Sequence, residues 1–143
     1  MDKVFLDTNV ILDLFLDRRN KDAVARVAQK AKAGMLRCYC SYLSVADIAY
    51  ILRKTHTQDE IKGGIKDLMS WCEVLAPMSD DVNECLRMNH PDFEDALQII
   101  TAENKSCDII LTGNTRHFEG YTDILVISPE QLLILRCLHL SDS

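Results

Sequence analysis

The chain has 143 residues, of which 48% are hydrophobic and 27% charged, a balance typical of one folded domain over residues 1–143 and not of a disordered chain. The net charge of −6 argues against a wide nucleic-acid-binding face, although an acidic pocket would help to gather divalent cations. No apolar stretch approaches the roughly 20 residues of a membrane-spanning helix, and the first residues lack a signal-peptide pattern, so we expect a soluble, cytoplasmic protein with no membrane partner.

Short apolar runs alternate with amphipathic segments along the chain. Strands are predicted over residues 4–6, 36–41, 72–76, 108–112 and 124–127. Helices are predicted to follow the first strand, to cover residues 20–34, 44–54, 57–71 and 79–88, and to start again at Asp92 and Pro129. This alternation predicts a three-layer α/β/α fold with a short-stranded, mostly parallel central sheet.

Individual residues add local expectations. Ser79 is expected to cap its helix, and the pair Gly63-Gly64 is expected to weaken or bend the helix that contains it. Asp13 and Asp17 are expected to face solvent, with a lean of Asp13 toward the edge of the site as the alternative. No Cys-x-x-Cys pair occurs, so the six cysteines are expected to be reduced core residues and not disulfide or zinc ligands.

Residues 4–13 place a carboxylate where a buried strand gives way to a helix. Asp7 follows three apolar residues and precedes an apolar run at helical spacing. Ligands of open α/β sheets bind outside the carboxyl ends of the strands, so Asp7 is a candidate site residue. The alternative is that Asp7, Thr8 or Asn9 only caps the helix.

Further polar residues recur at the predicted ends of other strands. Asp47 lies just inside the helix after the second strand, Asp92 and Asp95 open the helix before the fourth, and Asn114 follows the fourth. Convergent oxygen ligands of this kind suit Mg²⁺ or Mn²⁺. Capping is the alternative for the aspartates, because Ser44 with Asp47 and Asp92 with Asp95 both have capping-box spacing.

Four segments together resemble the PIN domain, and within it the VapC-like toxin branch. They are residues 4–13 (VFLDTNVILD), 44–54 (SVADIAYILRK), 92–98 (DFEDALQ) and 110–118 (ILTGNTRHF). The resemblance implies a Mg²⁺- or Mn²⁺-dependent endoribonuclease that hydrolyses RNA and is the toxin of a toxin–antitoxin pair. It also implies an antitoxin partner and a homodimer.

The resemblance assigns roles position by position. Asp7 and Asp95 match the acidic metal ligands of the family, Asp47 stands where a glutamate is usual, and Asn114 matches the polar residue of the fourth segment. Asp7, Asp47 and Asp95 are therefore the expected catalytic residues. The residues expected to orient the ligands or to meet the substrate are Thr8, Asn9, Asp92 and Arg116.

Three departures from the family pattern favour a second interpretation. Asp47 is shorter than glutamate by about 1.5 Å, one carbon–carbon bond. His117, expected to be a loop residue, replaces the usual acid before the phenylalanine, and Gly113 replaces a frequent arginine. The alternative is a catalytically weakened PIN module that binds a protein or RNA and regulates it. A phosphatase with Asp7 as nucleophile would need a second aspartate at the position of Asn9.

Overall fold

A computed structural model describes residues 1–141 and the side chains of residues 1–135. Within these residues one five-stranded sheet has the order β3-β2-β1-β4-β5, with every neighbouring pair parallel. The strands are β1 (Lys3–Leu6), β2 (Arg37–Ser41), β3 (Cys72–Leu75), β4 (Ile109–Leu111) and β5 (Leu125–Ile127). The helices are α1 (Thr8–Phe15), α2 (Lys21–Lys32), α3 (Tyr42–Leu52), α4 (Gln58–Met69), α5 (Ser79–Arg87), α6 (Phe93–Asn104), the 3₁₀ helix η1 (Thr115–His117) and α7 (Pro129–Ser141).

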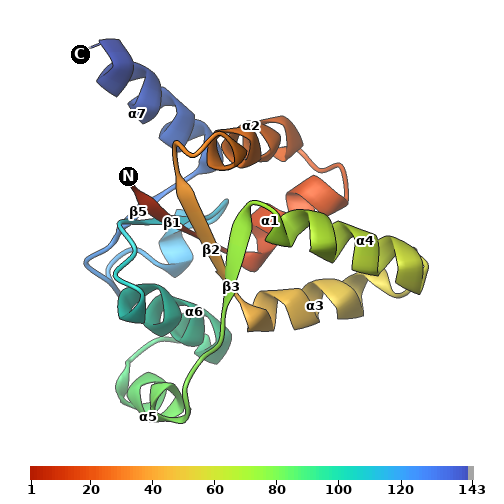
Figure 1. Cartoon of the computed structure of the whole chain (residues 1–143). Coiled ribbons are helices and arrows are strands. Elements are labelled where there is room, and N and C mark those ends of the chain that lie inside the picture. The colour runs from red at the N-terminus through yellow and green to blue at the C-terminus, as the bar shows by residue number, and fades with distance from the viewer. Residues whose placement is uncertain (142–143) are drawn as a thin grey trace.

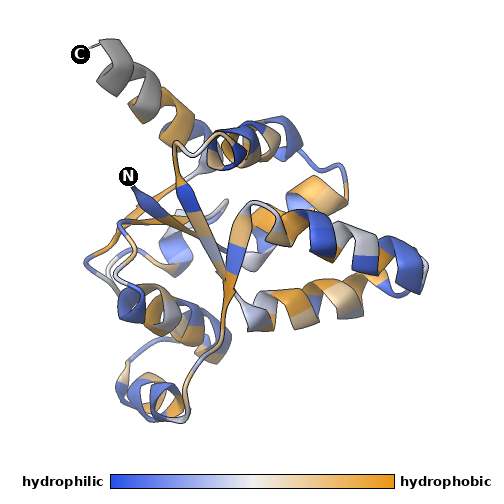
Figure 2. Cartoon of the chain, viewed as in Figure 1, coloured by the Kyte–Doolittle hydropathy of each residue, from blue (hydrophilic) through white to orange (hydrophobic). Residues whose placement is uncertain are grey.

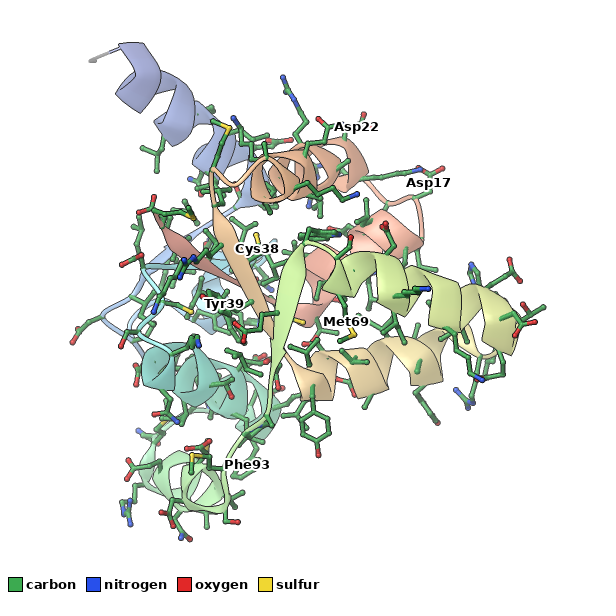
Figure 3. All side chains as sticks on the ribbon, in the orientation of Figure 1. Asp17, Asp22, Cys38, Tyr39, Met69 and Phe93 are labelled. Atoms are coloured by element: carbon green, nitrogen blue, oxygen red, sulfur yellow. The ribbon has the colours of Figure 1, made fainter. Side chains whose placement is uncertain are left out.

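Helices cover both faces of the sheet, which confirms the predicted three-layer α/β/α fold (Figure 1). Side chains of successive strand residues point to opposite faces. Val4 and Leu6 of β1 belong to the core shared with α1, α2, α3 and α4, whereas Phe5 packs in the core shared with α6. In β2, Cys38 lies in the first of these cores and Tyr39 lies in the second (Figure 3). None of the helices in the described part is long and apolar enough to cross a bilayer.

The register of the central strands places two polar residues at one edge of the sheet. Leu6, Leu111 and Ile127 are aligned across β1, β4 and β5. The backbone N–H of Asp7 then donates to the carbonyl of Leu111 at 3.0 Å, and that of Thr112 donates to Ile127 at 3.0 Å. The edge beyond the strand ends therefore begins with Asp7 and Thr112, side by side.

One predicted helix start and one predicted cap are wrong, although α5 does begin at Ser79 as predicted. Helix α3 begins at Tyr42, because the hydroxyl of Ser41 accepts the backbone N–H of Leu43 at 3.1 Å and so caps the helix directly after β2. Ser44 is instead fully buried inside the first turn. In α5 the cap position is Met78 and not Ser79, because the carboxylate of Asp81 accepts the backbone N–H of Met78 at 2.6 Å.

The helix predicted over residues 57–71 is confirmed, since α4 runs unbroken through Gly63 and Gly64. A Cβ at Gly64 would overlap the ring of Phe15 in α1, whereas a Cβ at Gly63 would meet nothing. Gly64 thus allows close packing of α1 and α4. The caps Asp92 and Thr57 support the starts of α6 and α4.

Burial of the polar and sulfur side chains corrects one prediction and confirms another. Asp13, expected in solvent, is buried and accepts a hydrogen bond from the amide of Asn20 at 3.2 Å, whereas Asp17 is exposed. Cys137 lies outside the residues with described side chains. The other cysteines are buried free thiols, as predicted: Cys38, Cys40, Cys72, Cys85 and Cys107.

The hydropathy of the helices follows their place in the layers (Figure 2). Helices α2 and α6 carry hydrophilic and hydrophobic residues side by side, as expected for helices with one face on a sheet. Helix α3 is hydrophobic along most of its length and leaves Tyr50 and Ile51 exposed. Its outer face is therefore more apolar than that of the neighbouring helices.

Candidate functional site

Asp7 combines the capping role and the site role that the sequence left open. It is the cap residue of α1, and its Oδ1 accepts the backbone N–H of Thr8 at 2.8 Å. Its Oδ2 accepts the hydroxyl of Thr112 at 3.0 Å, from the end of β4. Only 7% of Asp7 is exposed. The carboxylate is thus held rigidly by two donors at the edge of the sheet.

Burial raises the pKa of Asp7 from 3.8 to about 6. The hydrogen bond from Thr112 opposes this change, the negative charge of Asp95 adds to it, and the N–H of Thr8 also opposes it. The electrostatic effect of Asp95 means that these two residues, 88 positions apart in the sequence, lie near enough for their charges to interact. A cation close to both would favour the ionised form of Asp7.

Asp95 lies in the first turn of α6, where Asp92 accepts its backbone N–H at 3.0 Å. The capping role predicted for Asp92 is therefore confirmed. The pKa of Asp95 is raised by burial and then by the charge of Asp92, and it is lowered by His117 and His90. The side chain of Asp95 is 18% exposed, so this carboxylate is more accessible than Asp7.

Asp47 has a carboxylate neighbour that the sequence reasoning missed. Helix α3 begins five residues earlier, so Asp47 lies beyond the first turn and cannot form the predicted capping box with Ser44. A hydrogen bond to Asp47, then burial, then the charge of Asp47 raise the pKa of Glu94 to about 7. Glu94 stands next to Asp95 inside the third segment, and this acidic neighbour was the signal available in the sequence.

The loop after β4 approaches Asp95 through a histidine. The backbone N–H of Asn114 donates to the hydroxyl of Thr112 at 3.1 Å, and its side-chain amide lies 3.0 Å from Nε2 of His117. With Nε2 facing this amide, Nδ1 of His117 lies 3.5 Å from Oδ2 of Asp95. A neutral or cationic ring therefore stands where the family pattern has an acid.

His90 joins the same loop to the start of α6. Its Nδ1 accepts the backbone N–H of Asp92 at 2.9 Å, so its other nitrogen carries the proton. Nε2 then donates to the carbonyl of His117 at 2.6 Å, and the ring packs on Tyr121 with the centroids 4.1 Å apart. The remaining predicted residues, Asn9 on α1 and Arg116 on η1, are exposed.

The donor set fits a hard divalent cation in its chemistry. Asp7, Asp95, Asp47, Glu94 and Asn114 offer oxygen atoms, the ligands that Mg²⁺ and Mn²⁺ prefer. The pKa is raised at three of these carboxyl groups, first by burial at Asp7 and Asp95 and first by the hydrogen bond to Asp47 at Glu94, and the charge of a neighbouring carboxylate adds to each rise. Through residue 135, no three Asp, Glu, His or Cys side chains are close enough together to hold a metal ion. The carboxylates would therefore have to turn toward an ion.

The molecule is an α/β protein with a parallel sheet between two helix layers. Its candidate site is acidic and lies at the carboxyl ends of the central strands. The family model of the PIN domain matches residues 3–116, so the chain belongs to the PIN domain family. Ribonuclease VapC1 of Aquifex aeolicus (strain VF5) is 26% identical over 136 residues, which cover 91% of this chain and 92% of that protein.

Solved structures agree with this family in fold. One from VapBC2 of Rickettsia felis bound to a DNA fragment from its promoter has a TM-score of 0.71 at 12% identity and covers 88% of this chain and 98% of that chain. One from a toxin–antitoxin complex of Klebsiella pneumoniae has a TM-score of 0.65 at 21% identity, with 88% and 97% covered. The fold is therefore VapC-like, as the sequence resemblance implied.

Proposed function

We propose that this chain is a divalent-metal-dependent endoribonuclease that hydrolyses RNA phosphodiester bonds. The observation that carries the proposal is the buried carboxyl group of Asp7, held by Thr8 and Thr112 at the edge of the sheet, with the charge of Asp95 near enough to act on it. Membership in the PIN family and the similarity to Ribonuclease VapC1 of A. aeolicus support the same reaction class.

Asp7 and Asp95, with Asp47 and Glu94 beside them, would hold Mg²⁺ or Mn²⁺. When bound, the ion supplies a Lewis acid for the attack of water on phosphorus and stabilises the charge that develops. Thr112 and the N–H of Thr8 fix both oxygens of Asp7, and Asp92 fixes the turn that carries Asp95. These contacts reduce the reorganisation that metal binding requires.

The polar residues of the rim would bind and orient the substrate. Asn114 is held after the end of β4 by Thr112 through its backbone N–H and by His117 through its amide. Arg116 and Asn9 are exposed, and a guanidinium suits an RNA phosphate. Arg53, in contrast, stacks on Tyr50 with its guanidinium 3.6 Å from the ring centroid.

We further propose that the chain is the toxin of a toxin–antitoxin pair, acts in the cytoplasm, and forms a homodimer. The similarity to chains of the R. felis and K. pneumoniae complexes supports an antitoxin partner. Coexpression of the neighbouring reading frame, followed by co-purification and an RNA-cleavage assay, tests this proposal. We expect a stable complex with reduced cleavage.

The ribonuclease proposal is tested by cleavage of a defined RNA with Mn²⁺ and with a chelator. Wild type is compared with Asp7→Asn and Asp95→Asn. We expect Mn²⁺-dependent cleavage by the wild type and strong losses in both variants. Equal cleavage by wild type and Asp7→Asn would show that any activity comes from another source, and the proposal would fail.

A regulatory module with a weakened site is the second candidate. The contact of His117 with Asp95 and the lack of a group of three metal-binding side chains through residue 135 favour it. Calorimetric titration with Mn²⁺ separates the two functions. Absence of binding to the wild type, together with RNA or protein binding, would favour the regulator.

A further inference from the structure

A glutamine in the middle of α6 reaches the starts of two other helices. The amide nitrogen Nε2 of Gln98 donates to the hydroxyl oxygen of Thr8 at 3.0 Å and to that of Ser44 at 2.9 Å. The two hydroxyl oxygens are themselves 2.6 Å apart. All three residues are buried, with 1% of Gln98, 9% of Thr8 and 0% of Ser44 exposed. This closed triangle of hydrogen bonds joins α1, α3 and α6.

Each member of the triangle stands next to one candidate carboxylate. Thr8 follows Asp7 and donates its backbone N–H to that carboxylate. Ser44 precedes Asp47 by three residues on α3, and Gln98 follows Asp95 by three residues on α6. Residues three apart on a helix share a face. The triangle therefore joins the three helix starts that carry the aspartates, within one helical turn of each of them.

Stability does not explain a glutamine at this position. Its oxygen Oε1 has no hydrogen-bond partner among the described residues, and a buried acceptor without a partner is destabilising. A methionine has a similar length and shape and would remove that penalty. What methionine cannot supply is the pair of donated hydrogen bonds to Thr8 and Ser44. The function of Gln98 therefore lies in its two donors.

We propose that Gln98 is a positioning residue of the metal site. Its hydrogen bonds to Thr8 and Ser44 fix the starts of α1, α3 and α6 relative to one another, so that the side chains of Asp7, Asp47 and Asp95 can turn toward one divalent cation without movement of the helices. This inference rests on the metal-dependent function proposed above. It assigns the site a buried polar support that lies out of reach of the substrate.

The first test uses metal-free protein and hydrogen–deuterium exchange. Gln98→Met is compared with Thr101→Val, a matched change of a buried polar residue one turn further along α6 whose hydroxyl bonds only the carbonyl of Leu97. We expect faster exchange in the first turns of α1 and α3 in Gln98→Met and no change there in Thr101→Val. Unchanged exchange in Gln98→Met would overturn the proposed support.

The second test measures Mn²⁺ affinity by calorimetry and RNA cleavage over a range of Mn²⁺ concentrations. Loss of a group that orients metal ligands weakens metal binding by roughly 10–100-fold, and we expect this for Gln98→Met with an unchanged or higher melting temperature. Cleavage should return toward the wild-type rate when Mn²⁺ is saturating. Thr8→Val should resemble Gln98→Met, whereas Thr8→Ser keeps the hydroxyl and should resemble the wild type.

The outcomes distinguish this inference from the function on which it rests. Wild type that binds no Mn²⁺ would overturn the metal-dependent function and, with it, the metal-positioning role of Gln98, even if exchange changes. Wild type that binds Mn²⁺ with the same affinity as Gln98→Met would overturn the role of Gln98 alone. Weaker binding in Gln98→Met and Thr8→Val, but not in Thr101→Val, supports it.

Discussion

Two buried aspartates near helix starts, Asp7 and Asp81, have different surroundings. Asp81 is 6% exposed and accepts nitrogen donors on both oxygens, from Asn104 at 2.8 Å and from Met78 at 2.6 Å. Asp7 is equally buried and also accepts two hydrogen bonds, but the carboxylate of Asp95 is near enough to act on it. A buried carboxylate with two N–H donors stabilises its helix start, whereas one that also faces a like charge is poised for a cation.

The largest expected difference between these aspartates is in RNA cleavage. Asp7→Asn removes a negative charge from the edge where the metal would bind, and we expect a loss of roughly 10²–10³-fold, comparable to losing one group that stabilises the transition state. Asp81→Asn should cleave at the wild-type rate when folded. Initial rates with saturating Mn²⁺ measure both. Equal losses in the two variants would remove the functional distinction between the aspartates.

The second difference is in the free energy of unfolding without metal. A pKa of about 6 in place of 3.8 means that folded wild type binds the Asp7 proton more tightly than the unfolded chain. Wild type should therefore lose up to about 3 kcal/mol as the pH rises from below 4 to above 6. Asp7→Asn lacks this loss and should be more stable than wild type at pH 7.5.

Asp81→Asn should change stability in the opposite direction. Asparagine has only one acceptor oxygen, so either the Met78 N–H or the Asn104 amide would face a second donor. We therefore expect destabilisation by about 1–3 kcal/mol at pH 7.5. Urea unfolding of both variants in a chelator, at pH 4 and pH 7.5, measures these values. If Asp7→Asn is less stable than wild type at pH 7.5, the ionised carboxylate of Asp7 does not destabilise the folded protein and this expectation is wrong.

Gly63 and Gly64 are a second pair of identical residues with different surroundings. Gly64→Ala forces a methyl group against the ring of Phe15, and we expect destabilisation by about 1–3 kcal/mol. Gly63→Ala meets open space inside a helix and should stabilise by about 0.5–1 kcal/mol. Thermal unfolding of the two variants measures the difference, and equal effects would show that α1 and α4 do not depend on this close contact.

The smallest expected effect concerns the charge beside Asp95. His117→Asp places a carboxylate where the ring now lies 3.5 Å from Asp95. A charge near 4 Å in solvent contributes about 1 kcal/mol to binding a cation, so Mn²⁺ affinity should rise by about fivefold. His56→Asp, in the loop between α3 and α4, is the matched control. Weaker Mn²⁺ binding in His117→Asp than in His56→Asp would indicate that His117 supports the site.

The sequence was a good guide wherever a residue acts on its immediate neighbours. The apolar runs located all five strands, Asp92 was placed correctly as a cap, and Pro129 as a helix start. The start of α3 at Tyr42 and the cap of α5 at Met78 were misplaced because several serines and aspartates compete for each cap. The residue that caps the helix is selected by where the preceding segment ends in the folded structure. Local sequence spacing does not determine that position.

The amino-acid pattern was enough to establish the α/β class and the candidate aspartates, because strand and helix periodicity and chain order are short-range properties. Folding decided the partners: Thr112 bonds Asp7 from 105 residues away, Gln98 bonds Thr8 from 90, and His117 meets Asp95 across a loop. These contacts depend on strand register and helix packing, which arise from the whole core. Asp7 was therefore identifiable from the sequence, whereas the groups that position it required the structure.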